Sequence, residues 1–143
     1  MPLRSALVAM LVVATFLLSG CAEMQAMGGS DVLVNLLTSQ LGVTSNQATG
    51  GVGSILSLAK EKLSGMDFNT LSKLIPGAET FMKAAKESGA VTGTIGDQAG
   101  LQSAFSRLGM GSDLVGKFSG VLSDFVGKAG GEPAKTLLAS VLK

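Results

Sequence analysis

Segment 41–53, with the sequence LGVTSNQATGGVG, decides the fold class of this chain. Thr44 is followed three residues later by Gln47, and this spacing is typical of the capping box that opens a helix. Apolar residues then recur at helical spacing, which predicts one long amphipathic helix from Ser45 to about Ser64. Its expected apolar face consists of Val52, Ile55, Leu56, Ala59 and Leu63.

Three glycines, Gly50, Gly51 and Gly53, lie in the first turns of this helix. Each weakens a helix by up to ~1 kcal/mol relative to alanine, so their presence needs a reason. A phosphate-binding loop is one reason, but the cluster lacks the following Lys-Ser/Thr pair, has no strand before it and does not fit the G-x-G-x-x-G pattern. We therefore expect the glycines to allow the close approach of another helix.

Working outward, the same periodicity predicts further short helices separated by glycine or proline. We expect them at 31–41, 67–75, 78–88, 98–108, 112–129 and from Pro133 onward. Asp67 and Ser112 are the expected caps of their helices, and Gly130-Gly131 is the expected stop before the last one. Gly89–Asp97, with three glycines and several β-branched residues, predicts a loop with or without a short extended piece. The predicted fold is all-α: a compact bundle of six to seven short helices.

A weak internal repeat offers a second description of this bundle. Residues 41–46 and 108–113 align, and the pairing continues without gaps into the helices that follow. Two similar three-helix units, within halves 31–88 and 98–143, would then pack on one another. The alternative is that leucine-rich amphipathic helices align by chance.

The first twenty residues have the layout of a secretory signal. Arg4 gives a positive charge, Ala6–Leu18 is apolar, and Ser19-Gly20 supplies small residues before Cys21. The apolar run is shorter than the roughly 20 residues of a membrane-spanning helix. No later stretch is both long and apolar enough, so we expect no second membrane segment.

Leu18-Ser19-Gly20-Cys21 resembles the lipobox of bacterial lipoproteins. The resemblance implies that Cys21 is acylated and that the signal, residues 1–20, is removed before it. Ala22, in place of an aspartate, implies sorting to the outer membrane of a Gram-negative envelope, facing the periplasm. Residues 21–30 would form a tether that spans at most roughly 35 Å, followed by a helical domain at 31–143. The alternative is an ordinary cysteine that follows a signal.

Composition excludes several classes of function. Beyond Arg4 there are ten basic residues (eleven Lys and Arg, less one) and ten acidic ones, so nucleic acid is not an expected partner. Histidine is absent, which excludes Ser-His-Asp and Cys-His catalysis. The carboxylates are spread singly along the chain, so we expect no metal site, no cofactor and no enzyme. A two-carboxylate hydrolase is the remaining catalytic possibility.

Two sets of residues are candidate contact sites. On the 112–129 helix, Gly116, Gly120 and Gly127 fall within about 40° of each other, opposite the apolar stripe. Small residues at this spacing allow close helix contact, so this face could dock a protein partner or a second copy; the alternative is an ordinary solvent-facing surface. The second set would line an apolar cleft and comprises Phe68, Met82, Phe105, Phe118 and Phe125.

Segment 41–53, together with the run Leu114–Phe125, the later Gly-Gly-Glu and the leucine-rich end, resembles the bacterial domain of unknown function described as VcgC/VcgE. Residues 41–59 also look like the start of the YidB-like bacterial proteins. The resemblance covers roughly residues 31–143. It implies an all-α domain on a secreted or lipidated bacterial protein, with no activity and no catalytic residues to transfer.

Three functions follow from these observations. The leading hypothesis is a lipoprotein held to the membrane by acyl chains on Cys21, whose domain is a non-enzymatic interaction or structural module. The second is an apolar-ligand or lipid-binding helical domain. The third and most distant is a hydrolase that uses the scattered carboxylates.

Overall fold

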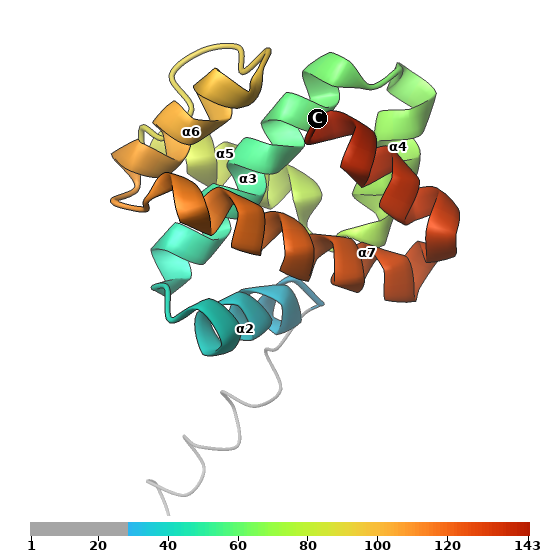
Figure 1. The fold of residues 1–143 in the computed structure, drawn as a ribbon, viewed down its shortest axis with the longest axis horizontal. Coiled ribbons are helices and arrows are strands. Elements are labelled where there is room, and N and C mark those ends of the chain that lie inside the picture. Colours follow the sequence, from blue (N-terminus) through green and yellow to red (C-terminus); the bar gives the residue numbers. More distant parts are fainter. Residues whose placement is uncertain (1–28) are drawn as a thin grey trace, which may run out of the picture.

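A computed structural model describes residues 29–143 (Figure 1). The expected signal, Cys21 and most of the expected tether lie outside the described residues. Within them the chain forms six α-helices and no strand, which confirms the all-α prediction. The helices are α2 (Gly29–Leu41), α3 (Ser45–Lys62), α4 (Gly65–Leu74), α5 (Ala78–Glu87), α6 (Gln98–Arg107) and α7 (Ser112–Val141). None of these helices is long and apolar enough to cross a membrane.

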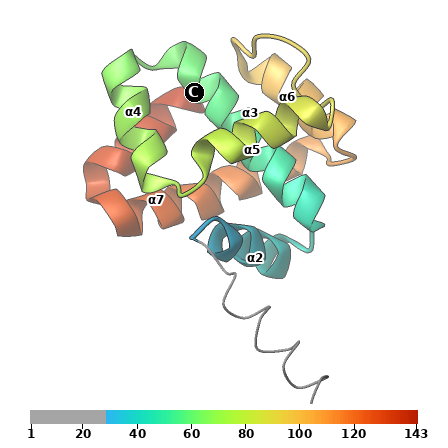
Figure 2. The same cartoon turned by 180° about the vertical axis from the view of Figure 1, so that it is seen from behind.

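Helix α3 is the centre of the fold (Figures 1 and 2). It packs against each of the other five described helices, and most extensively against α5. Every residue from Gly50 to Ala59 is buried, so α3 has no solvent-facing side over this stretch. Its two buried hydroxyls remain satisfied, because Ser54 Oγ donates to Gly50 O at 2.7 Å and Ser57 Oγ donates to Gly53 O at 2.8 Å. Sequence periodicity predicted one apolar face, whereas the neighbours bury all faces.

The three glycines of α3 are contact points for three different neighbours. A Cβ built on Gly53 would lie 2.6 Å from the Phe81 carbonyl carbon of α5, which is closer than real Cβ atoms come to other atoms. A Cβ on Gly51 would lie 2.5 Å from the Phe118 ring, and one on Gly50 would lie 2.7 Å from the Leu108 side chain. The expected close approach is confirmed, with α5 as the helix whose backbone comes nearest.

The predicted capping box is present at the start of α3. Gln47 N donates to Thr44 Oγ1 at 3.1 Å, and Thr44 N donates to Gln47 Oε1 at 3.0 Å. Gln47 Nε2 also donates to Leu108 O at 3.0 Å, which ties the start of α3 to the end of α6. Gly42 ends α2 with φ +67°, a left-handed conformation that favours glycine. These signals fixed the helix boundaries correctly from the sequence.

Two predicted caps are wrong. Ser64, not Asp67, caps α4: its Oγ accepts from Asp67 N at 3.2 Å and donates to Asp67 Oδ2 at 2.8 Å. Because Ser64 takes the N-cap position, α4 begins at Gly65, and α3 already ends at Lys62. Ser112 is the first residue inside α7, whose N-cap is Gly111 without a side-chain hydrogen bond.

The predicted Gly-Gly stop is a sharp bend inside α7. Gly131 has φ 72° and ψ −164°, which no helix contains, and Pro133 follows in the first turn of the final segment. Figure 1 shows this last segment turning back along α4. The two predicted helices are therefore present, on either side of Gly131.

The two sequence halves share one core. Their aligned turns have similar backbones, with φ +67° at Gly42 and +78° at Gly109. The helices that follow differ in environment: α3 is buried throughout its middle, whereas α7 exposes one side. Because α3 contacts helices from both halves, the described residues form a layer of helices around α3 rather than two separately packed units.

Candidate functional site

The structure divides the predicted glycine face of α7. Gly116 and Gly120 are exposed, and a Cβ on either would meet no atom within 4 Å. Gly127 is partly covered, because a Cβ there would lie 2.6 Å from Lys135 Cδ of the segment that returns after Gly131. The open part of this face is therefore limited to the first half of α7.

The five residues of the predicted apolar cleft do not line one cleft. Phe105 and Phe118 are fully buried in the core, edge to face with 5.1 Å between ring centroids and 85° between planes. Phe68 packs against the core from α4, while Met82 and Phe125 border two separate surface pockets. The prediction of a cleft is wrong because side-chain packing fills the centre of the bundle. The apolar side chains that were expected to line a cleft there belong to the core.

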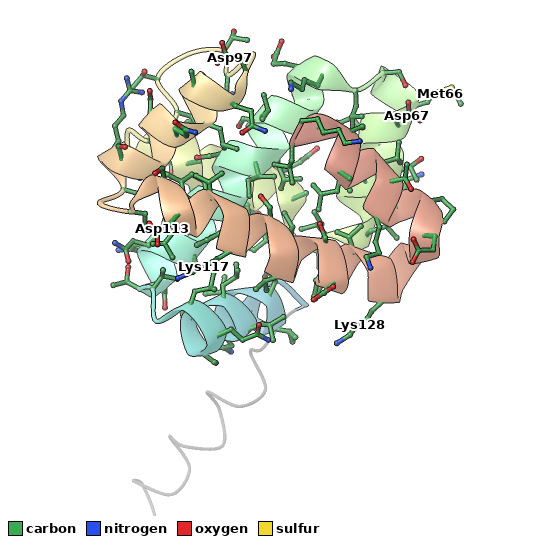
Figure 3. All side chains as sticks on the ribbon, in the orientation of Figure 1. Met66, Asp67, Asp97, Asp113, Lys117 and Lys128 are labelled. Carbon is green, nitrogen blue, oxygen red and sulfur yellow. The ribbon has the colours of Figure 1, made fainter. Side chains whose placement is uncertain are left out.

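Four carboxylates, three of which belong to the aspartates labelled in Figure 3 as Asp67, Asp97 and Asp113, take part in helix caps or surface ion pairs. Asp67 and Asp97 take part in helix caps, and Asp97 Oδ1 accepts from Gly100 N at 2.8 Å. Lys83 pairs with Glu87 and Lys117 with Asp113, both at 3.8 Å and both well exposed. Such pairs contribute at most about 0.5 kcal/mol each. Among residues 29–143, no three His, Cys, Asp or Glu residues are grouped so as to hold a metal ion.

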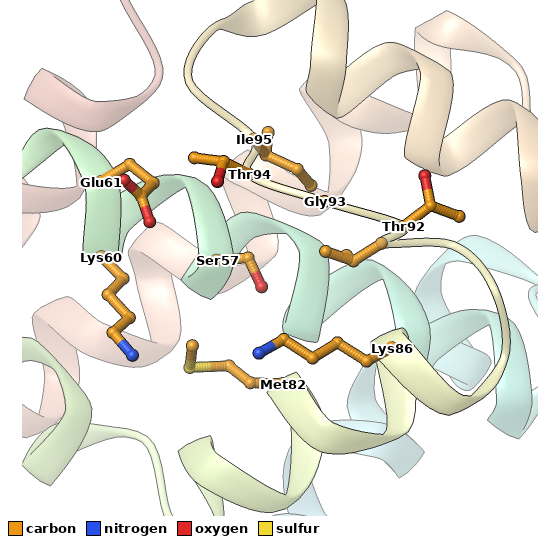
Figure 4. Close-up of a pocket in the computed structure, with 10 residues that line it drawn as sticks. Ser57, Lys60, Glu61, Met82, Lys86, Thr92, Gly93, Thr94 and Ile95 are labelled. Carbon is orange, nitrogen blue, oxygen red and sulfur yellow. The ribbon is translucent and has the colours of Figure 1, made fainter.

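A pocket that the sequence did not predict lies between α3, α5 and the 89–97 loop (Figure 4). Its volume is about 340 Å³, at the lower end of the range for small-molecule sites. Three segments build it. Helix α3 supplies Ser57, Lys60 and Glu61, helix α5 supplies Met82 and Lys86, and the loop supplies Val91, Thr92, Gly93, Thr94 and Ile95.

The loop wall of this pocket is held in place from both sides. Val91 and Ile95 are buried, and Val91 N donates to Ala85 O at 3.0 Å. From α6, the Arg107 guanidinium donates to Ala90 O at 3.3 Å and to Thr92 Oγ1 at 2.9 Å. The loop prediction is confirmed, and the structure forms no strand there. Its β-branched residues were the one sequence signal that this loop packs down rather than projecting into solvent.

Comparison with known proteins identifies the family. Residues 17–143 match the family described as "Protein of unknown function VcgC/VcgE (DUF2780)", and the chain belongs to this family. The match begins four residues before Cys21 and so includes the Leu18–Cys21 motif. No curated protein and no solved structure matches the chain.

Proposed function

We propose that this member of the VcgC/VcgE family is a lipoprotein of the bacterial envelope, and that its helical domain is a non-enzymatic interaction or structural module. The observation that carries the proposal is the Leu18-Ser19-Gly20-Cys21 motif at the end of an apolar run. The family match supports it, since the matched region spans this motif as well as the helical domain. Acyl chains on Cys21 would give a durable anchor, because two or more chains bind a membrane far more strongly than one.

The anchor would hold the domain near one face of the bilayer. Seven residues, 22–28, lie between the acylated Cys21 and the first residue of α2. The eight residue steps from Cys21 to Gly29 cover at most about 30 Å when fully extended. Helix α2 would be the element nearest the membrane, and its only charged side chain is Asp31. By resemblance to other bacterial lipoproteins, Ala22 favours the outer membrane and the periplasmic side.

The described surface favours protein contact over insertion into lipid. Val32 and Met66 are the exposed large hydrophobic residues of segment 29–143, and they lie on different helices, α2 and α4. A domain that inserts into lipid presents a contiguous apolar patch. A partner would instead meet mixed polar surfaces, such as the open side of α7 around Gly116 and Gly120.

The anchor is tested by metabolic labelling with an alkyne fatty acid in a Gram-negative host. We expect label and membrane association for the natural chain, and loss of both for Cys21→Ser. Ser19→Ala is the matched control, because it keeps a small residue at that position and should label normally. Equal labelling of Cys21→Ser and the natural chain would disprove acylation at this residue.

The proposed contact between the open side of α7 and a partner protein is tested by photo-cross-linking in cells. A cross-linker is placed at Gly120 and, as a control, at Lys73 of α4. Discrete adducts from position 120 that are absent from position 73 are the expected result. Adducts of equal pattern from both positions, or monomer alone from position 120 under several growth conditions, would count against a docking face on α7.

A further inference from the structure

We propose that the pocket between α3, α5 and the 89–97 loop binds a small organic dianion, such as a dicarboxylate or a phosphomonoester with a short apolar body. Lys60 from α3 and Lys86 from α5 both border this pocket. In Figure 4 their amines point toward the Met82 side chain from opposite sides. Two ammonium groups on one pocket, brought together from separate helices, are the feature that selects a doubly charged ligand.

Like most lysines of segment 29–143, Lys60 and Lys86 have side-chain amines without a protein partner. Lys83 and Lys117 each pair with a carboxylate one helical turn away. The side-chain amines of Lys60 and Lys86 form no ion pair and no hydrogen bond with any residue in segment 29–143. Their charges are therefore available to a ligand without the loss of an existing contact.

The remaining lining suits an anion that carries carbon. Thr92 and Thr94 lie on the loop wall, and Arg107 holds the Thr92 Oγ1 from the α6 side. Ser57 is less useful as a donor, because its hydroxyl already donates to Gly53 O. Met82, Val91 and Ile95 add apolar surface, which inorganic phosphate would not use but a short carbon chain would.

The pocket is formed before any ligand arrives. Arg107 and the buried side chains of Val91 and Ile95 fix the loop, and the buried middle of α3 fixes the opposite wall. Preformed walls lower the entropy cost of binding. The ordering that remains is that of two exposed lysine side chains, so we expect weak binding, in the millimolar range.

Glu61 also borders the pocket and opposes an anion. Two lysines against one glutamate leave the lining with one net positive charge. Figure 4 shows Glu61 beside Thr94, on the other side of Ser57 from the Met82 end. Removal of the Glu61 charge should therefore strengthen the binding of an anion, whereas removal of either lysine charge should weaken it.

The test is an NMR titration of the full chain in nonionic detergent micelles, with labelled methionine methyl groups and the Met82 signal assigned by Met82→Leu. The probes are succinate and glycerol 3-phosphate, with acetate and glycerol as singly charged and neutral controls. We expect a saturable shift of the Met82 methyl with either dianion, a weaker response to acetate and none to glycerol. Added salt should weaken the binding, since these charges are exposed.

Charge variants then decide between a built site and general attraction. Lys60→Gln and Lys86→Gln keep most of the side-chain stem and should each weaken dianion binding by about threefold to tenfold. Lys73→Gln, on α4 and away from the pocket, should leave it unchanged, and Glu61→Gln should strengthen it. The absence of a saturable Met82 shift at tens of millimolar of both dianions, or equal weakening by all three lysine variants, would overturn the proposal.

Discussion

Replacing Gly53 with alanine places a methyl group where the backbone of α5 lies. The new Cβ would be 2.6 Å from the Phe81 carbonyl carbon and 2.7 Å from Ala85 Cβ, and the Phe81 oxygen is closer still. An ordinary contact begins near 3.4 Å, so the carbonyl carbon must recede by about 0.8 Å (3.4 less 2.6). Because the obstacle is backbone, no change of side-chain rotamer relieves it.

Two opposing effects set the magnitude of this change. Alanine in a helix interior is favoured over glycine by up to about 1 kcal/mol. Overpacking a filled core costs about 1–3 kcal/mol, and the upper end applies here because α3 and α5 form the most extensive helix contact of the fold. We expect Gly53→Ala to lower the free energy of unfolding by about 2 kcal/mol and the melting temperature by roughly 8 °C.

The measurement is urea unfolding of the unacylated chain from Ala22, followed by far-UV circular dichroism because the chain has no tryptophan or tyrosine. Gly120→Ala is the matched control, since α7 leaves open space at that Cβ. It should raise the free energy of unfolding by about 0.5–1 kcal/mol. If Gly53→Ala is as stable as Gly120→Ala, the close contact between α3 and α5 is not what requires glycine.

Three further experiments test the start of α3, its contact with Phe118 and the fixing of the 89–97 loop. Thr44→Ala removes the capping box and should cost about 1 kcal/mol in urea unfolding, with an unchanged m-value. Gly51→Ala and Phe118→Leu should be non-additive in a double-mutant cycle, because the smaller side chain makes room for the Cβ that would otherwise meet the Phe118 ring. Arg107→Ala frees the loop, so amide exchange should quicken at residues 90–95 while that of α3 stays slow.

Local signals were enough to predict most helix boundaries. The Thr44–Gln47 box and the glycines at 42 and 131 act through hydrogen bonds and backbone angles within a few residues. The error at Asp67 arose because two capping residues compete within one turn, whereas α7 begins one residue earlier than expected, with Gly111 as its N-cap. In the first case the earlier Ser64 takes the N-cap position and Asp67 becomes its partner.

Burial and pockets were harder to predict, because they depend on which helices meet. Phe105 and Phe118 lie on two different helices, and their rings meet only once the chain has folded. The spacing of apolar residues within one helix cannot distinguish a ring that lines a cleft from a ring that lies in the core. Lys60 and Lys86 are likewise surface residues of two separate helices when each helix is considered alone. Their shared pocket depends on the loop packing across both helices.

The packing of α5 against α3 determines both the need for glycine at position 53 and the geometry of the dianion pocket. Gly53 lets α5 lie directly against α3, and this contact sets how far apart their exposed ends can be. Lys60 is the first exposed residue after the buried middle of α3, and Lys86 lies in the last turn of α5, so both lysines stand at the edge of this contact. A site supported by rigid helices keeps its geometry better than one on loops alone. Opening α3 from α5 by Gly53→Ala should therefore weaken dianion binding as well as stability, whereas Gly120→Ala should leave binding unchanged.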